Sequence, residues 1–220
     1  MKVLLLGATG RTGKLALQKA LQQGYEVHVL VRDAGKIKAE HPHLKVFEGD
    51  PSKSEDMSEA MEGCEAVISV LNISRTSDFP WAPLRTPRTY LSAVMRLLLV
   101  QAVAFGLKRV VICSAWGVAE TRPELPGWFR WLVDHSHIGV AYEDHERQEQ
   151  LVMNSSLDWT IVRPVGLTNG TRSASVRKSF GGSPKPTLTI SRLAVAAFMV
   201  GCLREEDTIG KAITLSSSKE

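Results

Sequence analysis

The chain has 220 residues, of which 44% are hydrophobic and 23% charged, which is usual for a globular protein of one domain. Its formal net charge is +4, but the basic residues are dispersed, so an anionic small ligand explains the excess better than a nucleic acid. No apolar stretch reaches the ~18 residues that cross a bilayer, and the N-terminal apolar run is too short for a signal peptide. We therefore expect a cytoplasmic protein without nucleic-acid or membrane partners.

In the first part of the chain, short strands alternate with helices. The segments that are apolar or alternate like strands are Lys2–Leu6, Glu26–Val31, Leu44–Phe47 and Ala66–Leu71. Residues 12–23 carry apolar side chains at helical spacing, and residues 54–62 form a second helix for which Ser54 is the predicted N-terminal cap. An irregular segment with three prolines follows, over residues 72–89.

The same alternation continues to the C-terminal part of the chain. Helices are predicted over residues 90–105, 141–153 and 191–203, the last opened by Ser191. Strands are predicted over Arg109–Cys113, Trp159–Val162 and Ala212–Leu215. Strands that alternate with helices indicate parallel βαβ units, so we expect one Rossmann-type α/β domain over residues 1–220, a doubly wound parallel sheet with helices on both faces.

Ligands of such sheets bind outside the carboxyl ends of the strands. The segments expected there are the long loops 72–89, 114–140 and 164–190. We therefore expect the binding site to be built from these loops and from the turn after the first strand.

That turn has the sequence GATGRTG, with glycines at positions 7, 10 and 13 between a strand and a helix. In the dinucleotide fingerprint, the first glycine permits a tight turn, the second lets backbone amides approach a pyrophosphate, and the third allows close helix packing. The helix N-terminus adds partial positive charge. A merely tight strand–helix turn is the alternative, but the full context favours a bound dinucleotide.

The residues after the second strand favour a phosphorylated dinucleotide. NAD sites usually place an acidic residue there, whereas this chain has Arg32, followed by Asp33. Arg11 in the glycine loop can reach the same pocket, and two guanidinium groups suit a 2′-phosphate. Surface arginines bonded to nearby carboxylates are the alternative. Asp50 is expected at the adenine edge, although a cap on the turn before Pro51 fits it almost as well.

These motifs, in order along nearly the whole chain, resemble the atypical short-chain dehydrogenase/reductase superfamily in its NAD(P)H-binding, NmrA-like branch. GYEVHVLVRD and EDHERQEQLVMNSSLDWTIVRP are most similar to the flavin reductase/biliverdin-IXβ reductase group. The resemblance implies hydride transfer from NADPH, with Ser114 as the hydroxyl beside the nicotinamide. The residues assigned to the cofactor are Gly7, Thr9, Gly10, Arg11, Thr12, Gly13, Arg32, Asp50, Leu71, Asn72, Pro164 and Val165.

Two features separate this chain from that group. Val165 and Gly166 follow Pro164 where the tetrapyrrole reductases place a histidine near the substrate, and residues 115–136, rich in tryptophan and proline, are unlike the group. Trp116, Trp128 and Trp131 in this stretch are candidates for stacking on a flat acceptor, or for anchoring a loop to the domain.

The sequence lacks the tyrosine–lysine pair with which ordinary carbonyl reductases of this superfamily protonate an alkoxide. Tyr25, Tyr90 and Tyr142 are followed four places later by valine, valine and glutamate. Flavins and quinones need less help from an acid, because their reduced anions are delocalised. Ser114 is placed to donate a hydrogen bond to the acceptor or the carboxamide, or else it is a strand-end serine bonded to backbone.

Neither cysteines nor histidines form a metal pattern. Cys64, Cys113 and Cys202 lie in apolar surroundings without C-x-x-C spacing, which indicates reduced, buried thiols. The spacing of His135, His137 and His145 matches no zinc motif, although His145 occupies the position of the lysine in relatives that have the pair, and a relay role is open.

The sequence thus predicts a reductase that uses NADP(H) on a flavin, quinone or tetrapyrrole-like acceptor. A non-catalytic sensor of the NADP(H) redox state, of the NmrA-like type, is the first alternative, and reduction or isomerisation of a specific metabolite by residues of the 115–140 loop is the second. We expect a small-molecule acceptor as the partner, and a monomer or weak homodimer.

Overall fold

A computed structural model of the protein describes residues 1–170 and 175–218. Its main sheet has eight strands in the order β3-β2-β1-β4-β5-β6-β10-β8. All neighbours are parallel except β8, which pairs antiparallel with β10. The bounds are β1 (Lys2–Leu6), β2 (Glu26–Val31), β3 (Leu44–Glu48), β4 (Ala66–Ser69), β5 (Arg109–Cys113), β6 (Asp158–Pro164), β8 (Val176–Ser179) and β10 (Lys211–Ser217).

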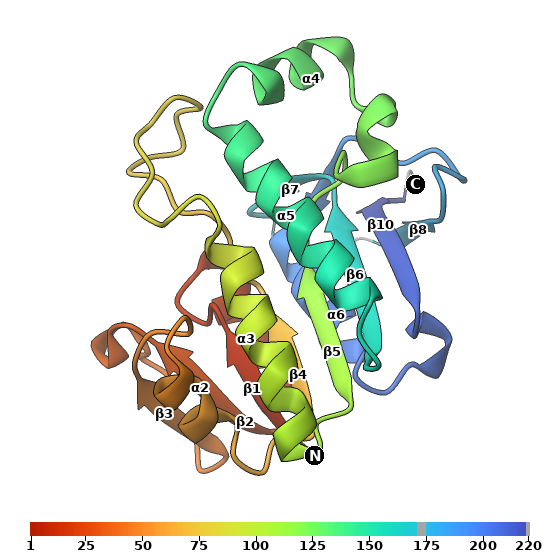
Figure 1. The fold of residues 1–220 in the computed structure, drawn as a ribbon. Helices are drawn as coiled ribbons and strands as arrows, with labels where there is room; N and C mark the ends of the chain where they lie inside the picture. The colour runs from red at the N-terminus through yellow and green to blue at the C-terminus, as the bar shows by residue number, and fades with distance from the viewer. Residues whose placement is uncertain (171–174, 219–220) are drawn as a thin grey trace.

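Helices cover both faces of this sheet (Figure 1). On one face α1 (Arg11–Gln22) packs beside α6 (Arg192–Gly201) over a core of buried aliphatic side chains. On the other face lie α2 (Ser54–Met61), α3 (Tyr90–Phe105) and α5 (Ile138–Met153), over a second core. The predicted doubly wound α/β fold is therefore confirmed, with one antiparallel edge strand added.

The segments predicted as long loops contain regular structure. Residues 114–140 hold the 3-10 helix η2 (Ala119–Glu124) and the short helix α4 (Gly127–Asp134), and α5 begins three residues earlier than predicted. Residues 164–190 hold β8 and a small parallel pair, β7 (Gly166–Thr168) with β9 (Thr189–Ser191). The remaining 3-10 helices are η1 (Ala34–Lys36) and η3 (Glu206–Thr208).

Of the two predicted N-terminal caps, one is confirmed and the other is wrong. Ser191 caps α6 as predicted, because its Oγ accepts from the Ala194 amide at 3.1 Å. Ser54, by contrast, is not the cap of α2: Lys53 takes that position, and the Ser54 hydroxyl accepts from the Gln101 side chain of α3 at 2.9 Å. The local sequence favours Ser54 as a cap, but its hydroxyl is hydrogen-bonded to a side chain of the neighbouring helix instead of to a backbone amide of α2.

A buried arginine fastens the segment after β5 to the sheet. Arg163 on β6 donates to both carboxylate oxygens of Glu149 on α5, at 2.9 and 2.6 Å, and also to Glu120 in η2. Arg163 and Glu149 are fully buried, whereas Glu120 is largely exposed. This ion-pair network fixes the position of the segment that carries α4 above the carboxyl ends of the strands (Figure 1).

Candidate functional site

The glycine loop turns tightly between β1 and α1. Gly7 adopts a left-handed φ of +86°, and a Cβ there would lie 3.0 Å from the Val70 backbone at the end of β4. A Cβ on Gly13 would lie 2.0 Å from the carbonyl oxygen of Gly7, so a side chain at position 13 would displace the loop. The loop therefore places the first turn of α1, with its free backbone amides, next to the carboxyl ends of β1 and β4.

A cavity of about 450 Å³, here called the glycine-loop cavity, opens beside this turn. An ion pair joins its two sides, because Arg11 contacts Asp78 of the 72–89 segment at 2.9 Å. Among the residues that line it are Gly7, Thr9, Gly10, Arg11, Thr12, Gly13, Leu71, Asn72, Ser74, Arg75, Asp78, Cys113, Ser114, His145 and Arg192. Eight of the twelve residues assigned to the cofactor by sequence thus surround one space.

A second space of about 490 Å³, here called the aromatic cavity, adjoins the first. Its lining is mostly apolar and comes from the ends of β5 and β6, from α4 and α5, and from the β7–β9 pair. Its main lining residues are Trp116, Pro126, Trp128, Phe129, Tyr142, Pro164, Val165, Leu167, Leu188 and Arg192, together with Asn72, Ser114 and His145. Two of the three predicted tryptophans belong to it, whereas Trp131 does not line it.

Ser114 and His145 line both cavities, so they form part of the wall between them. Both side chains are buried, with 5% and 4% exposure. Within the described residues, Ser114 Oγ and His145 Nδ1 have no hydrogen-bond partner. Burial lowers the pKa of His145 to about 4, so the imidazole is neutral near pH 7. Unsatisfied buried polar atoms are costly, and a ligand between the cavities would satisfy them.

The other reactive groups near this wall are held in their neutral forms. The Tyr142 hydroxyl donates to the Trp116 carbonyl at 3.1 Å, and burial raises the pKa of this tyrosine to about 12. Burial also raises the pKa of Cys113 to about 12, so its thiol is not a nucleophile at neutral pH. All three cysteines are free, as predicted. The site therefore offers hydrogen bonds and an apolar surface rather than a strong acid or a thiolate.

Two of the predicted cofactor residues, Arg32 and Asp50, lie outside both cavities. Arg32 is exposed at the end of β2, and both residues lie close enough to Tyr90 to influence its pKa. The Asp50 carboxylate accepts from the amide and hydroxyl of Ser52, which is the turn-capping role that the sequence left open. The predicted pairing of Arg11 with Arg32 on one phosphate remains a prediction, since Arg11 contacts Asp78 here.

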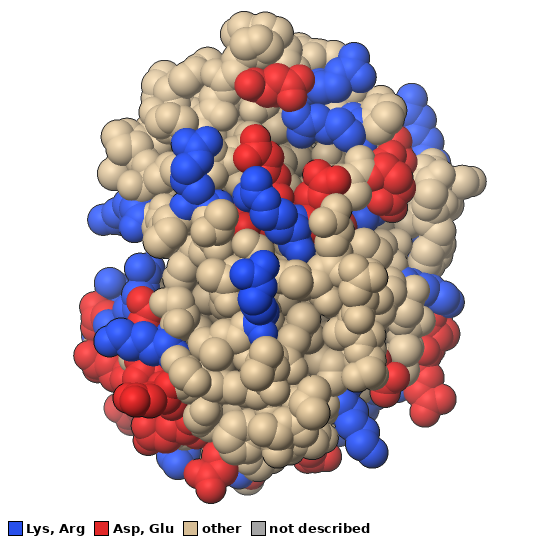
Figure 2. Space-filling view, in the orientation of Figure 1, with Lys and Arg blue, Asp and Glu red and all other residues tan. Residues whose placement is uncertain are grey.

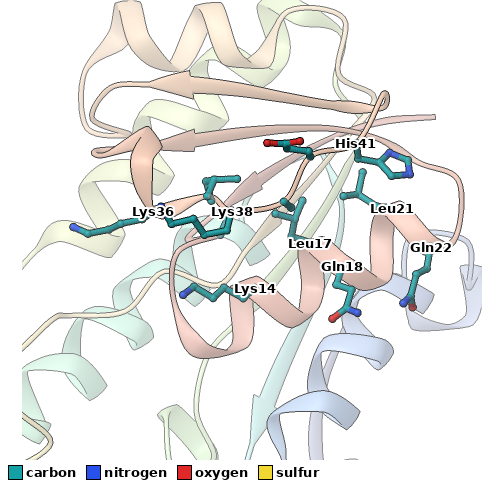
Figure 3. A pocket seen from close by; sticks show the side chains of 12 residues that line it. Lys14, Leu17, Gln18, Leu21, Gln22, Lys36, Lys38 and His41 are labelled. Carbon is teal, nitrogen blue, oxygen red and sulfur yellow. The ribbon is translucent and has the colours of Figure 1, made fainter.

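A separate hollow of about 470 Å³ lies between α1 and residues 36–41 (Figure 3). Leu17 and Leu21 of α1 line it, and Lys14, Lys36 and Lys38 gather at one end. It shares no lining residue with the two cavities. Its lysines concentrate positive charge between the first turns of α1 and the segment that follows β2.

Sequence reasoning missed several residues of the site. Arg192 lines both cavities and donates to the Asn169 side chain at 2.6 Å, but a sequence pattern at the start of a helix gives no sign of this. Leu167 and Leu188 enter the aromatic cavity because β7 and β9 pair, and three-residue strands are too short to be recognised. Phe129 could have been found only by recognising α4.

The described residues give no sign of a metal centre or of a membrane span. Within residues 1–170 and 175–218, no three His, Cys, Asp or Glu side chains are arranged to hold a metal ion. None of the helices in this described part has the length and apolar character that crossing a bilayer requires.

A doubly wound sheet with a glycine loop at the β1/β4 switch point defines a dinucleotide-binding protein. A family model described as NAD(P)H-binding matches residues 7–206, and the chain belongs to that family. The predicted membership of an NAD(P)H-binding family is therefore confirmed.

Individual relatives are similar to this chain at low sequence identity. The chain is 28% identical over 177 residues to an oxidoreductase of Pestalotiopsis microspora, covering 74% of this chain but only 66% of that protein. It is 26% identical to sanguinarine reductase of Eschscholzia californica, covering 100% of this chain and 90% of the relative.

Solved structures confirm the fold. An anaerobillin reductase from Escherichia coli has a TM-score of 0.81 at 19% identity, with 100% of this chain and 98% of that chain covered. A short-chain dehydrogenase/reductase from Veillonella parvula, in complex with NADP, has a TM-score of 0.76 at 17% identity, with 98% and 94% covered. At such identities the likeness concerns the fold alone.

Proposed function

We propose that the protein is an NADPH-dependent reductase that passes a hydride to a planar conjugated acceptor such as a flavin, a quinone or a tetrapyrrole. The observation that carries this proposal is the wall formed by Ser114 and His145, which has a dinucleotide-type cavity on one side and an aromatic cavity on the other. Hydride transfer requires a donor and an acceptor in contact, and two adjoining cavities provide that arrangement.

The residues around the glycine loop fit a dinucleotide. Gly7 and Gly13 allow the loop to pack closely, and the free amides of the first turn of α1 suit a pyrophosphate. When bound, the nicotinamide supplies the hydride. Ser114 and Asn72, which line both cavities, would orient its carboxamide end, and Arg192 would contribute positive charge beside the phosphates.

The aromatic cavity fits a flat conjugated acceptor better than a simple ketone. Trp116, Trp128 and Phe129 offer rings for stacking. No tuned acid serves this cavity within the described residues, because Tyr142 has a raised pKa and His145 is neutral. A reduced conjugated acceptor delocalises its negative charge, so hydrogen bonds from Ser114 and His145 suffice to hold it while water supplies the proton. Two similar proteins are named as reductases of sanguinarine and of anaerobillin, which agrees with this class of acceptor.

The charge around the end of β2 supports NADP(H) over NAD(H). Asp33, the residue that counts against a 2′-phosphate, is paired with Lys36 at 3.1 Å. Arg32 beside it is exposed, and Lys14 lies on the first turn of α1. Arg11 would join the phosphate only by leaving Asp78, and exposed ion pairs of this kind are weak, roughly 0–1 kcal/mol.

The test is to follow NADPH oxidation with a panel of FMN, riboflavin, quinones and biliverdin. Ser114→Ala should lower kcat about 100-fold, the lower end of the range for a lost donor to the reacting groups, while the Kd for NADPH rises by no more than about tenfold, because the rest of the dinucleotide keeps its contacts. Ser179→Ala is the matched control, because Ser179 is also buried, its hydroxyl has no hydrogen-bond partner among residues 1–170 and 175–218, and it lines neither cavity. Tight NADP⁺ binding without turnover on any acceptor would contradict the proposal and favour a redox sensor.

A further inference from the structure

The helix α4 and the 72–89 segment lie toward one end of the molecule, beyond the carboxyl ends of the strands (Figure 1), and together they carry four exposed aromatic rings. Phe79 and Trp81 come from that segment, with 61% and 43% exposure, and Trp128 and Trp131 come from α4, with 69% and 56%. Folded proteins rarely expose contiguous apolar groups of this size without a function for them.

Direct contacts between side chains link these rings into one surface, here called the aromatic end. The Phe79 and Trp81 rings lie 5.4 Å apart, and the Trp81 indole donates to the His135 carbonyl at 2.7 Å. The His135 ring stacks on Trp131 at 4.8 Å, and Trp128 lies one turn away on the same helix. The aromatic end is therefore a built surface rather than a chance scatter of side chains.

The charged residues around the aromatic end favour a negatively charged partner. Its two acidic side chains are already engaged, since Asp78 pairs with Arg11 and Asp134 with Arg122. The 72–89 segment and α4 also carry the arginines Arg75, Arg85, Arg88 and Arg130, for which no ion pair occurs within the described residues. Two carboxylates of α5 share a hollow with Arg88: Glu143, which pairs with Arg147, and Glu146, so the arginines of these segments outnumber the unpaired carboxylates beside them. Figure 2 shows blue side chains beside largely tan surface at the upper left, where the 72–89 segment lies in Figure 1.

The aromatic end also contains the edge of the aromatic cavity. Trp128 and Leu188 both line that cavity and both are mostly exposed, so the cavity wall reaches the molecular surface at these two residues. A protein partner seated on this end would cover the opening, whereas a bilayer would deliver an apolar molecule into it. Tryptophan with arginine is also the composition of surfaces that rest at the interface of anionic membranes.

We propose that the aromatic end docks on an anionic lipid surface and that the acceptor is an apolar quinone drawn from that bilayer. The second part rests on the proposed reductase function, and the first does not. This proposal differs from the expectation of no membrane partner, which rested on the lack of a bilayer-spanning stretch in the sequence. The four rings lie in two segments 47 or more residues apart, and only the fold brings them together.

The test measures co-sedimentation of the full chain, without coenzyme, with phosphatidylglycerol-containing vesicles and with neutral phosphatidylcholine vesicles. We expect binding to the anionic vesicles that weakens as salt is added. Phe79→Ser combined with Trp131→Ser should abolish it. Phe105→Ser is the matched control, since Phe105 is another exposed phenylalanine, at the far end of α3. Loss of binding by the control, or no binding by the wild type, would overturn the proposal.

A charge reversal tests the same surface without removing a ring. Arg130→Glu should lower the vesicle partition coefficient by more than about fivefold, whereas Lys108→Glu, at an exposed site before β5, should change it little. The proposal is wrong if the wild type does not bind vesicles but forms a dimer that the double variant Phe79→Ser, Trp131→Ser dissociates. In that case the aromatic end is a contact surface between two copies of the chain.

Turnover separates this proposal from the reductase. Phe79→Ser should reduce a short-chain, water-soluble quinone at the wild-type rate but a long-chain quinone in anionic vesicles at least about tenfold more slowly, because only the second reaction requires docking. Vesicle binding without turnover on any acceptor refutes the reductase and leaves the docking surface standing. Turnover without vesicle binding refutes the docking alone.

Discussion

At the scale of single residues, the proposed preference for a coenzyme with a 2′-phosphate depends on Arg32. This guanidinium lies at the end of β2, and the nearby Asp33 is neutralised by Lys36. We expect Arg32→Glu to weaken NADPH binding at least about tenfold more than NADH binding, because a charge-assisted bond contributes roughly 1.5–3 kcal/mol. Fluorescence titration of both coenzymes measures the ratio, with Arg96→Glu on α3 as the charge-matched control. Equal losses for the two coenzymes would refute a 2′-phosphate contact.

A second prediction at this scale concerns His145 and the pH dependence of the free energy of unfolding. Burial holds its folded pKa near 4, below the usual 6.5, so the unfolded chain binds more protons between these values. The contribution of this buried, neutral imidazole to the free energy of unfolding is fully present above about pH 6.5 and is lost as the pH falls toward 4. We expect the urea midpoint of the wild type to fall more steeply from pH 7 to pH 5 than that of His145→Gln. Parallel curves for the two proteins would show that this imidazole is not neutral and buried in solution.

At the scale of elements, sequence patterns predicted those segments whose own residues decide their structure. The seven strands recognised from apolar runs and the helices with apolar spacing are all present, and Gly7 and Gly13 occupy the turn expected of them. Residues 127–134 were missed because Pro126 and Gly127 indicate a loop, and α4 depends on distant contacts such as Phe129 against Tyr142. β7, β8 and β9 have three or four residues and exist only through their partners.

The segment that carries α4 is attached through Arg163, and the two carboxylates that bind this arginine should differ in importance. Glu149→Gln removes a buried charge from a buried partner and should cost about 3–5 kcal/mol of unfolding free energy. Glu120→Gln removes a largely exposed partner and should cost less than about 1 kcal/mol. Urea denaturation of both variants measures the difference. A larger loss for Glu120→Gln would mean that the network is not organised around the α5 carboxylate.

At the scale of the whole molecule, the site is a product of topology more than of any motif. The order β1-β4-β5-β6 brings the glycine loop, Asn72, Ser114 and Pro164 to one edge of the sheet, and that much follows from the strand order expected of the fold. The aromatic cavity does not, because its walls come from α4 and the β7–β9 pair. Eight of the residues predicted from the sequence to bind the cofactor line the glycine-loop cavity together with Ser114, whereas of the three predicted acceptor residues only Trp116 and Trp128 line the aromatic cavity.

Coenzyme binding should stabilise the folded molecule as a whole, because a dinucleotide in the glycine-loop cavity would contact both the loop after β1 and the segments after β4 and β5, and would bind the unfolded chain far less. At 100 times its Kd, NADP⁺ should add about 2.7 kcal/mol, which corresponds to a rise in Tm of roughly 5–11 °C for a chain of this length. NAD⁺ at the same concentration should raise Tm by much less if the 2′-phosphate is recognised. Differential scanning fluorimetry over a range of concentrations of both coenzymes measures these Tm shifts. The fragment 2′,5′-ADP contains only the adenosine end of NADP⁺. It should produce part of the rise in Tm if that end binds independently of Ser114 and His145. A shift of equal size with NAD⁺ would leave the dinucleotide site in place but remove the reason for assigning Arg32 to a phosphate.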